Sequence, residues 1–348
     1  MHRQDRQVAC AYDESFLRHD LPGHPESASR VAAVMAALRE ASLLSEMRAL
    51  PVAPAPAAVL ERIHDPLYLS WLRRTAEETP GYVDPDTYIV ADSYEAAIRA
   101  AGAALQCVQA VLDGEADSAV AVVRPPGHHA LRARPMGFCL INNIACAASF
   151  ALEEAALERV LILDFDVHHG NGTQEAFAAD PRVLYISLHQ QPLFPGSGSP
   201  QERGHGPGLG LTVNIPLAPG SGDPSYRAAM ERLVVPLARR HQPQMILVSA
   251  GYDAHWREPL ANLRATVPGF DNLALAVKQL AEELCGGRLA FVLEGGYDHE
   301  VLASSLKNLV RILLGRPEDC EDPMGPSPIP PRDDLGFLDS LRSTFGLK

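Results

Sequence analysis

The alternation of short apolar runs with amphipathic segments of helical period most constrains the fold of this 348-residue chain. The apolar runs suit buried strands and lie at 118–123, 160–165, 183–188, 245–250 and 289–293. Helical patterns separate or follow most of them, at 93–112, 141–157, 224–240, 269–284 and 299–314. Strands that alternate with helices form parallel sheets covered by helices. The sequence therefore predicts an α/β fold with an open, mostly parallel sheet and helices on both faces.

The chain shows no internal repeat and no break in composition before about residue 316. Because 47% of its residues are hydrophobic, it can fill one large core. We therefore expect a single domain over residues 1–316. Residues 317–348 read as a proline-rich C-terminal extension, which we expect to pack on or near that domain.

The charge balance is acidic, with a formal net charge of −13 and no run of Lys or Arg. Binding to nucleic acid needs clustered cations, so direct nucleic-acid binding is disfavoured. A cationic substrate, such as a lysine-rich peptide or a polyamine, would be attracted to this surface. The acidity equally fits a protein whose charge only keeps it in solution, and the oligomeric state stays open.

The six cysteines are scattered and form no CxxC pair, which argues against structural disulfides and a thiolate zinc site. No stretch approaches the roughly 20 uncharged apolar residues needed to span a bilayer. The first residues of the chain are polar and charged. We therefore expect a cytoplasmic protein with no membrane partner.

Polar segments follow four of the predicted strands at their carboxyl ends. They are RPPGHH at 124–129, DFDVHHGN at 164–171, GYDAH at 251–255 and EGGY at 294–297. Ligands bind beyond the carboxyl ends of the strands in open parallel sheets. The convergence of four such segments predicts one active site at this edge of the sheet.

Asp166 and His168 lie two residues apart at the end of a strand, so their side chains point the same way in extended chain. A carboxylate and an imidazole together suit Zn²⁺, which takes nitrogen and oxygen ligands at about 2.0–2.2 Å. A third ligand must come from another segment, and a catalytic site leaves one further position open for water.

His128 and His129 follow a rigid Pro-Pro-Gly turn beside this predicted metal site. A neutral imidazole is a natural general base near pH 7, and Asp164 and Asn171 are candidate partners to orient it. Tyr297 follows two glycines that permit a tight turn, where its phenol could donate to a polarised carbonyl oxygen.

Together these motifs resemble those of histone deacetylases. The matching segments, in the family's order, are 124–129 (RPPGHH), 136–143 (MGFCLINN), 164–173 (DFDVHHGNGT), 187–189 (SLH), 194–198 (FPGSG) and 294–297 (EGGY). The chain looks most like the bacterial class II-type branch, alongside acetylpolyamine amidohydrolases and acetoin-utilisation proteins. The resemblance runs from about residue 19 to 314 and implies an arginase/deacetylase-like fold.

The resemblance implies a role for each motif residue at the reacting centre. Asp166 and His168 match two of three metal ligands, and Tyr297 matches the tyrosine that polarises the substrate carbonyl. His129 matches the general base and then acid, oriented by Asn171. His128 matches a first, electrostatic histidine that is paired with Asp164.

Further positions match the family's substrate and cation sites. Phe138 and Phe194, with Gly137 beside the first, match the walls of the tunnel that holds the acyl-lysine stem. Asp86 matches an acid that grips the substrate backbone, and Arg30 matches an arginine of an acetate-exit channel. The resemblance also implies a structural potassium site, formed by Asp164, Asp166, His168, Ser187 and Leu188.

One position departs from the pattern that we expect of the family. An Asp-Pro-Leu segment is expected after Gly-x-Asp-Ala, with its aspartate as third metal ligand, whereas this chain has Glu258-Pro259-Leu260. A glutamate carboxylate reaches about 1.5 Å farther than that of aspartate. We expect Glu258 to be the third ligand, with Asp253 or His255 as substitutes.

The leading interpretation is a zinc-dependent deacetylase with one Zn²⁺ per chain, which hydrolyses the amide of an N-acetylated amine by metal-activated water. Acetyl-lysine in proteins, acetylpolyamines and longer acyl chains all remain possible substrates, and Fe²⁺ or Co²⁺ would also suit the ligands. A second interpretation is a catalytically impaired homologue that binds acyl-lysine, because of Glu258. A ureohydrolase is a third, but it needs two metals and typically Asp-x-His-x-Asp, and Gly170 stands at the fifth place.

Overall fold

A single eight-stranded sheet runs through the molecule in the computed structural model, which describes residues 6–332 and 335–347. The strand order is β2-β1-β5-β10-β9-β6-β7-β8, and every neighbouring pair is parallel. The strands are β1 (Val8–Ala11), β2 (Arg48–Leu50), β5 (Ser118–Ala121), β6 (Val160–Asp164), β7 (Val183–Gln190), β8 (Thr212–Leu217), β9 (Met245–Ala250) and β10 (Leu289–Leu293). The α/β fold with a parallel sheet is confirmed.

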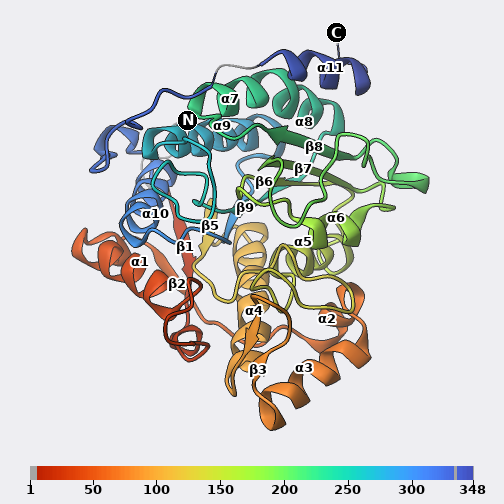
Figure 1. Cartoon of the computed structure of the whole chain (residues 1–348), viewed down its shortest axis with the longest axis vertical. Helices are drawn as coiled ribbons and strands as arrows, with labels where there is room; N and C mark the ends of the chain where they lie inside the picture. The colour runs from red at the N-terminus through yellow and green to blue at the C-terminus, as the bar shows by residue number, and fades with distance from the viewer. Residues whose placement is uncertain (1–5, 333–334, 348) are drawn as a thin grey trace.

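Helices cover both faces of this sheet (Figure 1). One layer holds α1 (Ala28–Glu40), α7 (Asp223–Ala229), α8 (Val235–His241), α9 (Val267–Cys285) and α10 (His299–Leu313). The opposite layer holds α2 (Ala57–Ile63), α3 (Pro66–Glu78), α4 (Ser93–Leu112), α5 (Asn143–Glu153) and α6 (Asn171–Phe177). Within β6, Leu161 and Leu163 face the first layer, whereas Val160 and Ile162 face the second. Burial on both faces explains why the central strands read as continuous apolar runs.

Local capping sets where several helices begin. Asn142 accepts a hydrogen bond from the N–H of Ala145, so α5 begins at 143 rather than at the predicted 141. Thr266 caps α9 in the same way, and Asp298 accepts from two N–H groups of α10. The predicted helix at 224–240 is present as α7 and α8, joined by a π-helical stretch at Met230–Val234.

A two-stranded antiparallel hairpin of β3 (Gly81–Tyr82) and β4 (Tyr88–Ile89) lies outside the main sheet and carries Asp86 in its turn. Near the other end of the chain, α11 (Gly336–Thr344) buries Leu338 and Leu341 in the same core as α8 and α9. The segment before it contacts the domain too, since the indole Nε1 of Trp256 donates to the carbonyl of Gly325 at 3.2 Å. The division at residue 316 stays a prediction.

In the described part of the chain, no helix is both long and apolar enough to cross a membrane.

Candidate active site

The four polar segments meet at the carboxyl edge of the sheet because their strands are neighbours. In the order β5-β10-β9-β6, these strands release the segments that begin at 124, 294, 251 and 164. A cavity of about 410 Å³ opens between them. Its lining includes, among the residues singled out from the sequence, Asp86, His128, His129, Gly137, Phe138, Asp166, His168, Phe194 and Tyr297. Tyr82, Leu193 and Leu260 also line it, and none of these three was predicted.

Three side chains turn their ligand atoms toward one another: Asp166 and His168, which line the cavity, and Asp253, which is fully buried. Nδ1 of His168 lies 3.2 Å from Oδ1 of Asp166 and 3.3 Å from Oδ2 of Asp253. Oδ2 of Asp253 is buried and has no hydrogen-bond partner among the residues that the structure describes. One nitrogen and two carboxylate oxygens, one of them without a donor, fit the ligand set of Zn²⁺ and similar divalent ions.

The electrostatics of this group favour a cation. Burial alone would lower the pKa of His168, but the carboxylates of Asp166 and Asp253 raise it to about 10. The same negative field that holds a proton on the imidazole would attract a divalent ion in its place. The sequence analysis considered Asp253 only as a substitute ligand, and the structure makes it the third member of the group.

Glu258 is not part of this group, so the prediction of Glu258 as third ligand is corrected in favour of Asp253. Its Oε2 accepts hydrogen bonds from the N–H groups of Tyr297 at 3.0 Å and Asp298 at 3.4 Å. Asp253 is bound directly to the Asp166 segment, because its Oδ1 accepts from the N–H of Val167 at 2.9 Å. Glu258 lies five positions farther along the same loop.

Glycines allow the two carboxylates to approach this closely. A Cβ on Gly251 would lie 2.1 Å from an oxygen of Asp166, and one on Gly295 would lie 2.1 Å from an oxygen of Asp253. Such distances exclude any side chain at either glycine. The N–H of Gly295 also donates to Oδ2 of Asp166 at 2.8 Å, which fixes that carboxylate.

The tandem histidines have different partners. Nδ1 of His128 lies 3.0 Å from Oδ2 of Asp164, and Nδ1 of His129 lies 2.8 Å from Oδ1 of Asn171. Burial lowers the pKa of His129 well below its usual value, and the positive fields of His128 and His168 lower it further. Burial also disfavours the charged form of His128, but Asp164 and Asp166 raise its pKa to about 10. These surroundings favour a neutral imidazole at His129 and a charged one at His128.

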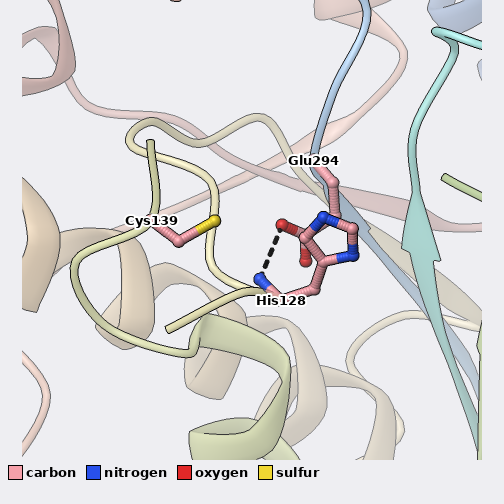
Figure 2. Close-up of side chains that lie close together, drawn as sticks. All are labelled: His128, Cys139 and Glu294. Carbon is pink, nitrogen blue, oxygen red and sulfur yellow. Dashed lines mark hydrogen bonds between the residues drawn. The ribbon is translucent and has the colours of Figure 1, made fainter. Parts of the chain in front are cut away.

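Glu294 holds the turn that carries these histidines, a role that the sequence analysis missed. Its Oε2 accepts from the N–H groups of Gly127 at 2.7 Å and His128 at 3.1 Å, and its Oε1 accepts from the hydroxyl of Ser249 at 3.0 Å. Figure 2 shows this carboxylate against the main chain of His128, with the thiol of Cys139 nearby. Three donors occupy the carboxylate, and the His128 ring bonds to Asp164, so this second cluster fits a structural clamp better than a metal site.

Tyr297 lies between β10 and α10 and forms one wall of the cavity. Burial raises the pKa of its phenol well above the usual value, so the hydroxyl stays a hydrogen-bond donor. The guanidinium carbon of Arg30 lies 4.8 Å from the centroid of its ring. Arg30 itself is fully buried against Glu26, 3.0 Å away. It is not among the residues that line the cavity, and its assignment to an exit channel stays a prediction.

Aromatic rings form the remaining walls. The ring of Phe138 packs edge-on against that of Tyr297, with 5.7 Å between the ring centroids. The ring of Phe194 packs edge-on against that of His129, with 5.1 Å between the centroids. Gly137 has a φ of +55°, and a Cβ there would lie 2.5 Å from the His129 ring. Asp86 lies at the rim, where the hydroxyl of Thr87 donates to it at 3.1 Å, and burial with the nearby Asp84 raises its pKa.

The residues of the predicted potassium site lie on neighbouring strands. Asp164 at the end of β6 pairs in register with Ser187 on β7, and Leu188 follows. Asp164 and Ser187 are fully buried, and the hydroxyl of Ser187 lies 2.9 Å from Nδ1 of His189. Potassium binding at these residues stays a prediction.

The part of this chain that matches known proteins includes all the residues that line the cavity. The sequence signature of the histone deacetylase domain matches residues 24–313. Histone deacetylase 14, chloroplastic, from Arabidopsis thaliana is 41% identical over 316 residues, which cover 86% of this chain and 75% of that protein. Polyamine deacetylase HDAC10 from Homo sapiens is 39% identical over 315 residues, or 86% of this chain and 46% of that protein. A crystal structure of the HDA15 HD domain matches with a TM-score of 0.88 at 32% identity, covering 98% of this chain and 94% of that one.

Proposed function

Because this chain belongs to the histone deacetylase family, we propose that it is a metal-dependent deacetylase that hydrolyses the amide of an N-acetylated amine. The observation that carries this proposal is the group of Asp166, His168 and Asp253, because Asp166 and His168 line a cavity together with His129 and Tyr297. Ligands, proton acceptor and hydrogen-bond donor thus converge on one small volume, as amide hydrolysis requires.

One divalent ion, which we propose to be Zn²⁺, would be held by Asp166, His168 and Asp253. When bound, such an ion polarises a carbonyl oxygen and makes water more acidic. Fe²⁺ or Co²⁺ suits the same nitrogen and oxygen donors.

His129 is the proposed general base and acid. Its Nδ1–H donates to Oδ1 of Asn171, whose amide nitrogen is directed to the sulfur of Met136, so Nε2 keeps its lone pair. The lowered pKa keeps the ring neutral, as a base must be. Nε2 takes a proton from the attacking water and returns it to the amine nitrogen as the amide bond breaks.

Two further groups stabilise the charge that develops during this step. The Tyr297 hydroxyl donates to the acetyl oxygen as that oxygen becomes negative, which is the role of an oxyanion-hole donor. The charged His128, paired with Asp164, keeps a positive potential beside His129. The acetate and the amine are then the products.

The walls suit the uncharged methylene stem that acetyl-lysine and acetylpolyamines share. Phe138, Phe194 and Leu260 line the cavity, and Asp86 at the rim offers a carboxylate to a peptide N–H or to an ammonium group. The similar proteins include both a histone deacetylase and a polyamine deacetylase. We propose an acetylated amine of either kind as substrate, with a cytoplasmic location and bound K⁺ as further predictions.

Neither alternative interpretation gains support. The impaired acyl-lysine binder depended on Glu258 as an ill-fitting ligand, and the group of Asp166, His168 and Asp253 supports a ligand set without Glu258. A ureohydrolase would need a carboxylate where Gly170 stands, and a Cβ there would lie 2.2 Å from Oδ2 of Asp164.

The test is acetate release by the purified full chain from an acetyl-lysine peptide and from N-acetylputrescine, with metal analysis of the same sample. We expect turnover of at least one substrate, loss of turnover on chelation, and recovery with Zn²⁺ at close to one ion per chain. If the metal-loaded protein releases acetate from neither of the two substrates, the proposed function is contradicted.

A further inference from the structure

The turn that carries Tyr297 is held by specific hydrogen bonds to its main chain. Arg30 donates to the carbonyls of Glu294 at 2.6 Å and Gly296 at 2.7 Å. The carbonyl of Gly295 accepts from the N–H of Tyr252 at 3.1 Å. These bonds leave the N–H groups of Tyr297 itself and of the next residue to be satisfied from elsewhere.

Glu258 supplies that acceptor. Its Oε2 accepts from the N–H of Tyr297 at 3.0 Å and from that of Asp298 at 3.4 Å. Asp298 is the N-cap of α10, and its side chain accepts hydrogen bonds from the N–H groups of Glu300 and Val301. It is therefore not the acceptor for the N–H groups of Tyr297 and Asp298. Glu258 therefore joins the loop after β9 to the main chain at Tyr297.

Glu258 is itself well placed to hold the turn rigidly. Only 6% of the residue is exposed, and Pro259 restricts its backbone. Its N–H donates to the carbonyl of His255 at 2.9 Å, which closes the loop on which it lies. Its neighbour Arg257 pairs with Asp298 at 2.9 Å, so adjacent residues of this loop contact the same turn.

The other carboxyl oxygen of Glu258 makes its burial costly. Oε1 is buried without a hydrogen-bond partner among the described residues. An unpaired buried oxygen destabilises the loop, whereas the bonds of Oε2 satisfy two main-chain N–H groups that an apolar side chain would leave unpaired. The two bonds of Oε2 to the Tyr297 turn therefore explain a buried glutamate at this position.

We propose that Glu258 is a positioning residue for deacetylation: it fixes the main chain at Tyr297 and so aims the phenol at the acetyl oxygen. The inference rests on the proposed function and adds to it a residue outside the cavity lining. Arg30 bonds to the carbonyls of Glu294 and Gly296 and lies against the Tyr297 ring, whereas Glu258 bonds to the N–H of Tyr297, so the two restrain different groups of this turn. Among the described residues, Glu258 forms no hydrogen bond with Asp166, His168 or Asp253, and it acts on the reaction through Tyr297.

A double-mutant cycle separates positioning from a general structural role. A misplacement of about 1 Å costs roughly 10²-fold in rate, so Glu258→Leu should lower kcat by about 10- to 100-fold with little change in KM. In a Tyr297→Phe background the same substitution should cost less than about threefold, because the group that it positions is gone. Glu258→Gln keeps an oxygen acceptor and should recover most of the rate. Glu283→Leu, which removes an exposed glutamate of α9 that pairs with Arg239, is the matched control and should leave kcat and the effect of Tyr297→Phe unchanged.

Binding of octanoyl hydroxamate to the Zn²⁺-loaded protein gives a readout that needs no turnover. In the wild-type background, we expect Tyr297→Phe to weaken hydroxamate binding by about 3- to 10-fold, because one hydrogen bond is lost. In the Glu258→Leu background, the same substitution should have almost no effect on binding. Bound metal should be the same in all variants. If Glu258→Leu does not fold, Glu258→Met and Glu258→Gln provide the comparison.

The outcomes separate this inference from the proposed function. Additive effects of the Glu258 and Tyr297 substitutions, or no recovery in Glu258→Gln, would overturn the positioning role. Loss of bound metal in both Glu258→Gln and Glu258→Leu would overturn it too, since Glu258 would then be a ligand. If the wild type releases no acetate but its hydroxamate binding shows the coupling, the positioning role stands and the deacetylase proposal fails. If the wild type neither turns over nor binds the hydroxamate, both fail.

Discussion

The rings of His128 and His129 lie 4.0 Å apart between centroids, yet their surroundings drive their pKa values in opposite directions. Two carboxylates surround His128, whereas the nearest polar partner of His129 is the neutral amide of Asn171. A positive charge on His128 makes a second charge on His129 unfavourable. Adjacent residues of the same type therefore take the separate tasks of electrostatic support and proton transfer.

Removal of His129 tests this division of tasks. His129→Ala should lower kcat by about 10²- to 10⁴-fold, the usual contribution of a general base. It should leave bound metal unchanged, because His129 is not part of the Asp166, His168 and Asp253 group. Acetate release and metal content measured on the same sample check both statements, and near-wild-type turnover would show that another group transfers the proton.

Tyr297→Phe removes one hydroxyl and keeps the ring that packs against Phe138. The loss of one oxyanion donor should cost about 10²- to 10³-fold in kcat, with a small change in KM and no loss of metal. Steady-state kinetics with an acetyl-lysine peptide measure the effect. A loss below about threefold would mean that the phenol does not contact the reacting oxygen.

The central part of the fold could be predicted from the sequence, whereas the edges could not. Strands β5, β6, β7, β9 and β10 are buried on both faces and read as continuous apolar runs. The unpredicted strands β1, β2 and β8 lie at the two ends of the strand order. β2 has only three residues, two of them exposed, so no apolar run marks it. β1 is buried but has only four residues, within a polar and charged N-terminal segment, and the apolar residues of β8 (TVNIPL) are interrupted by Thr, Asn and Pro, so neither strand forms a continuous apolar run.

The motif residues could be placed at one edge because each directly follows a strand. Choosing between Asp253 and Glu258 as the third metal ligand was harder, since both follow β9. Only the folded loop shows that Asp253 is the one that lies beside Asp166 and His168. Two features do point to Asp253: it is the first acid after the strand, and Gly251 leaves room beside Asp166. Bonds between distant residues, such as Glu26 with Arg124 at 2.7 Å, have no signal in a local pattern.

The ligand set gives a direct test of that correction. Asp253→Asn and Asp166→Ala should each lose tightly bound metal and activity together, because each removes one of three protein ligands. Glu258→Gln should retain about one ion per chain. Metal analysis after gel filtration measures the difference, and the opposite pattern, with metal lost only from the Glu258 variant, would restore Glu258 as the ligand.

Asp271 on α9 gives a prediction about stability, away from the active site. Burial raises the pKa of this carboxyl to about 7, while a hydrogen bond from Nδ2 of Asn308 at 3.0 Å opposes the rise. The folded state therefore binds this proton more tightly than the unfolded chain, whose aspartate pKa is about 3.9. The stability that protonation of Asp271 contributes is complete below about pH 4 and is lost as the pH rises to about 7.

Asp271→Asn should remove this pH dependence, because the amide is never charged and its oxygen can still accept from Asn308. The variant should gain stability over the wild type as the pH rises from about 4 to 7, reaching about 1–2 kcal/mol once solvent screening of the partly exposed group is allowed for. Urea unfolding at pH 5 and pH 8 measures the difference in the free energy of unfolding. Asn308→Ala, which removes the donor but keeps the carboxyl, is the control, and its loss of stability between pH 5 and pH 8 should be larger than that of the wild type. A constant difference between Asp271→Asn and the wild type at both pH values would show that Asp271 is ionised throughout.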